Sequence, residues 1–226
     1  MRKTFLFIFL FSILSGILKA QDYNTGLMPK ININKKISDV WKTNLKLENQ
    51  LMVSQGTTGF FKDSDADFKR TDAQFSATRK LNYKSSLTGG YMLRMDEKKP
   101  AHRLSLFYSA ARKLRTLSLS HRFGVENTFK TGDNNEIRLR YRLSTAIPLN
   151  GTSIDANESY VKLSNEYVGT DEGGNRALEV RALAALGHEI GSRQKAELGL
   201  DYRRSEIGTN ANVQTLWVYL GWYFKL

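Results

Sequence analysis

The alternation of apolar and polar residues is the feature that most constrains this chain. In residues 137–147 the odd positions are Ile, Leu, Tyr, Leu, Thr and Ile, and the even positions 138, 140 and 142 are arginine. Side chains of a β-strand point alternately to the two faces of its sheet. This stretch therefore predicts a two-sided strand with one apolar face and one strongly cationic face.

The same period of two recurs along most of the chain. Eleven segments show it, and polar or turn-forming residues separate them. Each segment holds about ten residues, which is the length that a tilted strand needs to cross a bilayer. Beyond residue 20 no stretch has the length of a membrane-spanning helix, and none keeps a period of 3.6. The sequence therefore predicts an all-β fold, an antiparallel transmembrane β-barrel.

The number of strands is predicted to lie between ten and twelve. Single-chain bacterial barrels have an even number of strands, whereas eleven segments are visible. A further strand before Ile31 would give twelve, and loss of the first or third segment would give ten; twelve is favoured. Short periplasmic turns should alternate with longer outer loops, and the polar stretches 54–70, 169–174 and 205–212 are the predicted loops.

The last dozen residues, 215–226, form the predicted closing strand. A chain that ends on Trp-Tyr-Phe-Lys-Leu resembles the closing strand and C-terminal assembly signal of bacterial outer-membrane barrels. That resemblance implies the barrel-assembly machinery as a partner. The residues predicted to face lipid are the large apolar ones at even positions: Leu216, Val218, Leu220, Trp222, Phe224 and Leu226.

Residues 1–20 have the pattern of a cleaved signal peptide. Arg2 and Lys3 precede an apolar run over residues 5–14, and Leu-Lys-Ala at 18–20 fits a cleavage site. The run is too short for a membrane anchor. Residues 21–226 should then form one exported barrel domain in the bacterial outer membrane. Because the sequence has no cysteine, disulfides, thiolate metal sites and a lipoprotein anchor are excluded.

The charge balance is basic, with a formal net charge of +12. For an exported chain we expect outer-membrane lipid, lipopolysaccharide phosphates and small anionic solutes as partners, rather than nucleic acid. The three histidines are far apart and give no metal signature, and no nucleotide or calcium motif is present. Neither a metal nor a cofactor is expected.

The face opposite the apolar one should line the lumen and is the candidate functional surface. Small barrels fill their interior with side chains, and wider ones leave an aqueous channel. Either opposite charges plug a structural barrel, or the arginine row at 138, 140 and 142 lines a narrow pore that favours anions. The lumen candidates are Lys46, Glu48, Arg122, Glu126, Arg138, Arg140, Arg142, Lys162, Glu166, Glu179, Arg181, Lys195, Glu197, Asp201 and Arg203.

A soluble, lipocalin-like ligand-binding barrel has the same periodicity and is the alternative fold. It would turn its apolar face inward. Paired charges on the polar face argue against it. So do the aromatic residues on the apolar face, which suit a girdle at a lipid interface. These are Tyr91, Tyr108, Tyr141, Tyr167, Tyr202, Trp222 and Phe224.

An outer-membrane enzyme of the phospholipase type is the alternative function. It would need a serine and a histidine together on the lipid face. His121 is predicted to face lipid, but Ser118 and Ser120 point the other way. His102 and His188 lie near loop edges, where a structural role is expected. The sequence therefore predicts a small channel or a structural barrel and no enzyme.

A family resemblance covers nearly all of the chain beyond residue 20. It is carried by His121-Arg122-Phe123, by the stretch RLRYRL at 138–143, by IPLNG at 147–151, by YVKLSNEY at 160–167 and by Asn175-Arg176. These segments resemble the domain-of-unknown-function family 2490. The resemblance implies an outer-membrane barrel of Gram-negative bacteria and implies no activity.

Overall fold

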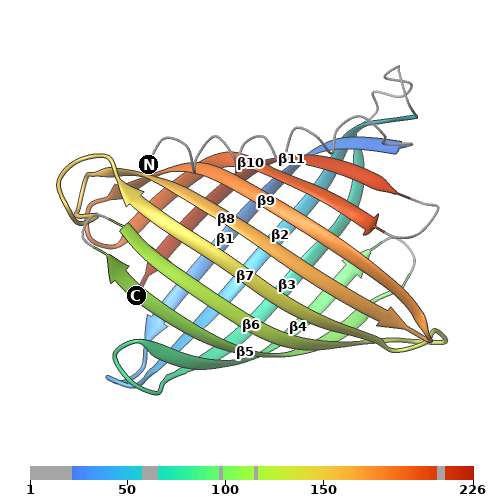
Figure 1. Cartoon of the computed structure of the whole chain (residues 1–226), viewed down its shortest axis with the longest axis horizontal. Coiled ribbons are helices and arrows are strands. Elements are labelled where there is room, and N and C mark those ends of the chain that lie inside the picture. Colours follow the sequence, from blue (N-terminus) through green and yellow to red (C-terminus); the bar gives the residue numbers. More distant parts are fainter. Residues whose placement is uncertain (1–21, 58–65, 97–98, 115–116, 208–211) are drawn as a thin grey trace.

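Eleven strands close into a single barrel in the computed structural model (Figure 1). The structure describes residues 22–57, 66–96, 99–114, 117–207 and 212–226, so the predicted signal peptide lies outside the described residues. The strands are β1 (Asp22–Lys36), β2 (Trp41–Thr57), β3 (Asp67–Lys80), β4 (Ser85–Asp96), β5 (Ala101–Leu114), β6 (Leu117–Lys130), β7 (Glu136–Pro148), β8 (Ser159–Glu172), β9 (Asn175–Ile190), β10 (Gln194–Ile207) and β11 (Val213–Lys225).

Eleven strands fall within the predicted range of ten to twelve, but the favoured number of twelve is wrong, and so is the prediction of a wholly antiparallel sheet. Of the residues before Ile31, those that the structure describes, 22–30, belong to β1, which is 15 residues long. Each strand pairs antiparallel with the next, but β1 pairs with β11 in parallel, from Asp22↔Val213 to Asn34↔Lys225. An odd number of up-and-down strands requires this, because the first and last strands then run in the same direction.

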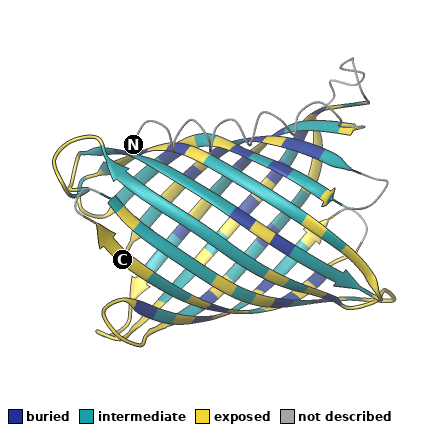
Figure 2. Ribbon diagram, in the orientation of Figure 1, coloured by how far each residue is buried: buried dark blue, intermediate teal, exposed yellow. Residues whose placement is uncertain are grey.

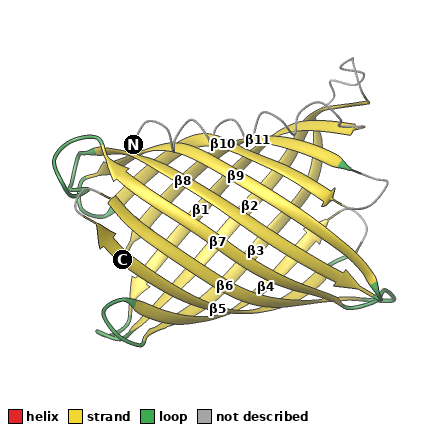
Figure 3. Cartoon of the chain, viewed as in Figure 1, coloured by secondary structure: helices red, strands yellow, loops and turns green. Residues whose placement is uncertain are grey.

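The described part of the chain consists of strands and their connections (Figure 3). Among these residues no helix is long and apolar enough to cross a membrane. The predicted loops are shorter than expected: β8 continues to Glu172, which leaves the two-residue turn 173–174, and β10 continues to Ile207. Part of the predicted loop 54–70, residues 58–65, and residues 208–211 lie outside the described residues.

Apolar side chains cover the outside of the barrel. Exposed and buried residues alternate along the strands (Figure 2). On β7, Ile137 and Leu139 are 50% and 65% exposed, and on β10 Leu198 and Leu200 are similarly exposed. A soluble barrel would turn this face inward, where it could be removed from water. The predicted division of the strands into an apolar and a charged face is therefore present, with the apolar face outside.

A small apolar cluster fills part of the interior beside the closing pair of strands. Trp217 and Met28 are almost completely buried, and Met52 and Tyr219 pack with them. Trp217 lies opposite Gly26 in the register of β1 and β11, and a Cβ at Gly26 would collide with the indole ring. Glycine is therefore needed here for the close approach of a large ring to the neighbouring strand.

Candidate functional site

The interior of the barrel contains a cavity of about 350 Å³ with a charged wall. Twelve lysine and arginine side chains line it, against five aspartate and glutamate side chains. The structure places twelve of the predicted lumen residues in this wall: Lys46, Glu48, Arg122, Glu126, Arg138, Arg140, Arg142, Lys162, Glu166, Arg181, Asp201 and Arg203. The remaining three adjoin it through ion pairs: Glu179 with Arg181, Glu197 with Lys162, and Lys195 with Glu197.

Glu166 on β8 joins arginines from both neighbouring strands. Arg140 and Arg142 on β7 each donate two hydrogen bonds to its carboxylate, at 2.9–3.2 Å. Arg181 on β9 is the third arginine, and it donates one longer hydrogen bond of 3.4 Å. Two-pronged guanidinium–carboxylate contacts fix geometry as well as neutralise charge. Glu166 therefore ties three strands together at one register.

Glu197 on β10 is the centre of a second cluster. Its carboxylate accepts hydrogen bonds from the hydroxyls of Tyr160, Tyr219 and Tyr223 at 2.7–2.9 Å. The Lys162 ammonium donates another at 2.8 Å. The side chain of Glu197 is completely buried. Buried carboxylates persist only when every lone pair is satisfied and a counter-charge is near, and both conditions hold here.

The sequence-based lumen set omits several charged residues that line this wall or pair with it. Asp72 on β3 accepts two hydrogen bonds of 2.8 Å from Arg94 on β4. Arg103 on β5 contacts Glu136 on β7 at 3.2 Å. Their positions in the alternation would have placed all four inside, because each strand has exposed apolar residues at the other parity.

Arg122 on β6 is the exception among the cavity arginines. No carboxylate of the described residues lies within ion-pair distance of it, and its buried Nε has no hydrogen-bond partner there. The guanidinium instead lies 4.0 Å from the centre of the Phe107 ring. An aromatic face stabilises a cation but does not neutralise it. Arg122 therefore adds a positive charge to the cavity wall without an ion pair of its own among the described residues.

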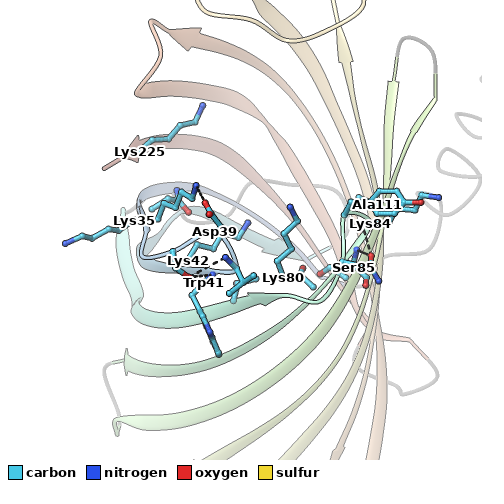
Figure 4. Close-up of a pocket in the computed structure, with 18 of the residues that line it drawn as sticks. Lys35, Asp39, Trp41, Lys42, Lys80, Lys84, Ser85, Ala111 and Lys225 are labelled. Atoms are coloured by element: carbon cyan, nitrogen blue, oxygen red, sulfur yellow. Dashed lines mark hydrogen bonds and ion pairs between the residues drawn. The ribbon is translucent and has the colours of Figure 1, made fainter.

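The mouth of the barrel beside the C terminus is rich in lysine (Figure 4). Lys42, Lys80, Lys84 and Lys225 surround a hollow of about 510 Å³. Lys36 donates a hydrogen bond of 2.7 Å to Asp39 in the β1–β2 turn and lowers the pKa of that carboxyl. The mouth thus extends the positive charge of the interior to the end of the barrel.

The three histidines lie on the outer face, and each contacts a hydroxyl on the neighbouring strand. His102 contacts Tyr91 at 2.6 Å, and His121 contacts Tyr141 at 3.0 Å. His188 contacts Ser159 at 3.0 Å. The serine that the sequence did not reveal is therefore beside His188 rather than His121. In the described part of the chain, no group of three or more His, Asp or Glu could hold a metal ion.

Comparison with known proteins gives one match. The model of the family described as "Protein of unknown function (DUF2490)" matches residues 26–214, which confirms the resemblance carried by the strand motifs. No curated protein and no solved structure matches the chain. The match covers most of the barrel, and the family description assigns no activity.

Proposed function

For this chain, which belongs to the DUF2490 family, we propose the function of an outer-membrane β-barrel whose interior selects small anions. The observation that carries this proposal is the cavity wall, in which twelve cationic side chains face five carboxylates and Arg122 forms no ion pair with a described carboxylate. The three carboxylates that adjoin the wall, Glu136, Glu179 and Glu197, leave the excess positive.

The exposed apolar face supports a place in a lipid bilayer. Water does not favour a closed belt of leucine, isoleucine and aromatic side chains, and large apolar patches on a protein surface mark contact with another apolar phase. In an outer-membrane barrel the same belt faces the hydrocarbon and the polar lumen lies within. The aromatic side chains Tyr91, Tyr108, Tyr167 and Trp222 are all exposed on it.

Fixed charge explains the proposed preference for anions. A cavity lined by one sign of charge raises the local concentration of the opposite ion. The cavity of about 350 Å³ is large enough to hold a small hydrated ion. Ions of the size of chloride, phosphate or a short carboxylate fit this space. The lysine-rich mouth would gather such ions, or the phosphates of lipid, before they reach the cavity.

A purely structural barrel is the second candidate, and the ion-pair clusters favour it. Glu166 and Glu197 have well-satisfied partners on neighbouring strands and would fix the register of those strands without any transport. The two candidates differ in what Arg122 does, because it is the cavity arginine that forms no ion pair with a carboxylate of the described residues.

Planar-bilayer recording on the refolded chain without residues 1–20 tests the proposal. We expect discrete conductance steps and a reversal potential that shows preference for anions over cations. Arg122→Gln should reduce that preference and leave folding intact, since no ion pair is lost. The matched control is Arg79→Gln, a cation on the exposed end of β3 at outward parity. Folded protein that forms no conducting steps, or Arg122→Gln that conducts with unchanged selectivity, would contradict the anion-selective role and favour the structural barrel.

A further inference from the structure

Ser159 and His188 form a pair with the arrangement of a nucleophile and its base. They lie directly opposite each other in the register of β8 and β9, and Ser159 Oγ is 3.0 Å from His188 Nδ1. At this distance the serine hydroxyl donates its proton to Nδ1 when the imidazole carries its own proton on Nε2. A serine becomes nucleophilic when such a base can accept its proton.

The pair lies at one end of an apolar groove on the outside of the barrel. The groove has a volume of about 960 Å³ and crosses the outer face from β2 and β3, past the closing pair β1 and β11, to β8 and β9. Leu186, Leu198, Leu220, Trp222 and Phe224 are among the large apolar residues that line it, and the small residue Ala196 lies directly opposite His188.

The other two histidines provide an internal contrast. His102 and His121 contact tyrosine hydroxyls, and neither lines the groove. Their contacts show that the outer face pairs its histidines with hydroxyls as a rule, so a hydrogen bond alone is no sign of catalysis. Only His188 combines an aliphatic hydroxyl with an adjoining apolar groove.

We propose that Ser159 and His188 form an acyl-ester hydrolase site for an anionic glycerophospholipid whose acyl chain lies in the groove. Ser159 Oγ bonds to the ester carbonyl carbon while His188 Nδ1 takes its proton. The bond from that carbon to the glycerol oxygen breaks, and His188 returns the proton to the leaving alcohol. Water then attacks the acyl-serine, His188 takes a proton from it, and the fatty acid leaves as the proton returns to Ser159.

The charge at this end of the barrel fits the proposed substrate. β8 begins and β9 ends at the lysine-rich mouth, so the pair lies at the same end of the barrel as Lys42, Lys80 and Lys225. Lys225 contacts Glu189, the residue after His188, at 2.9 Å. A phosphate headgroup would lie at this positively charged end of the barrel, with the acyl ester at Ser159 and the acyl chain along the apolar wall.

The test uses the full barrel folded in mixed micelles of detergent and phosphatidylglycerol. A fluorophosphonate probe should label Ser159, as located by peptide mass spectrometry, and the protein should release free fatty acid. Ser159→Ala, His188→Ala and His188→Gln should each lower the rate of release at least about 10²-fold, the usual contribution of a general base. His188→Gln keeps a hydrogen-bonding side chain of similar size, which separates loss of the base from loss of folding. His121→Ala is the matched control and should keep the wild-type rate.

Heat-modifiable migration on gels confirms folding for each variant. Folded wild-type protein that neither takes the probe nor releases fatty acid overturns the proposal. So does a rate that persists in folded Ser159→Ala or His188→Gln, or a probe adduct on another residue. Arg122 lies inside the barrel and this pair outside it, so the result is independent of the conductance measurements.

Discussion

On β10, Glu197 and Leu198 are neighbours in the chain but lie in opposite surroundings. Glu197 points inward, is 3% exposed and holds three tyrosine hydroxyls and a lysine, whereas Leu198 points outward and is 56% exposed. The inner face is stabilised by particular partners on particular strands. The outer face needs only apolar surface, which any large aliphatic side chain supplies. The loss of stability caused by a substitution on the inner face should therefore depend on which partner loses its contact. On the outer face it should depend only on the polarity of the new side chain.

The largest effect is expected for Glu197→Gln. Among the described residues, Glu197 is the carboxylate that forms ion pairs with both Lys162 and Lys195, whose side chains are 30% and 26% exposed. The change leaves both ammonium groups without that ion pair. Breaking a fully buried pair costs about 3–5 kcal/mol, and because the lysines are partly exposed we expect a loss near the lower end, about 3 kcal/mol. Urea unfolding of the barrel in lipid vesicles, followed by tryptophan fluorescence, measures it. Glu189→Gln is the control: its partner Lys225 is half exposed, so about 0–1 kcal/mol is expected. Equal losses of unfolding free energy in the two variants would contradict the larger contribution to stability that we assign to Glu197.

Leu200→Arg tests the outer face. Leu200 lies near the middle of β10 and is 50% exposed on the apolar belt. If that belt faces lipid, a charge at this depth should cost about 2–4 kcal/mol, whereas Leu200→Val should change little. The same vesicle titration measures both. A variant with arginine that folds as stably as the valine variant would argue against the proposed membrane position.

The smallest effect on stability is expected for Arg122→Gln, and Arg140→Glu, at another arginine of the inner face, is its comparison. Arg140 binds Glu126 and Glu166, so Arg140→Glu should destabilise the barrel by setting like charges together. Arg122→Gln loses no ion pair and should leave the unfolding midpoint nearly unchanged. Bilayer recordings measure a different property. There Arg122→Gln should clearly lose anion preference although its stability is nearly unchanged. Selectivity that depends on Arg140 and is indifferent to Arg122 would contradict the role given to the unpaired guanidinium.

The contact between Ser159 and His188 shows where sequence reasoning stopped short. The stretch 169–174 was predicted to be a loop, yet only Gly173 and Gly174 form the turn. Two-residue turns with glycine fix hairpin register. Counting thirteen residues back along β8 from Glu172, and thirteen along β9 from Asn175, reaches Ser159 and His188. The Gly173-Gly174 pair was therefore the signal in the sequence: taken as a two-residue turn, it predicts that Ser159 lies opposite His188.

What the sequence determined by itself was which side chains share a face. The period of two is a local property of an extended chain, so the arginines at 138, 140 and 142 and the apolar positions of the last strand could be assigned before any fold was known. It also showed eleven segments. The expectation of an even number then replaced that count with twelve, because a parallel closing pair is rare in such barrels.

The tertiary structure alone decided which strand meets which, and at what register. A shift of a strand by two residues keeps every side chain on its face but changes every partner. Local alternation therefore cannot choose Glu166 as the partner of Arg140, Arg142 and Arg181, or leave Arg122 without one. Those choices follow from turn lengths, from register shifts such as that between Arg204 and Ile207, and from closure of β1 on β11. They are properties of the closed barrel, and the proposed chemistry depends on them.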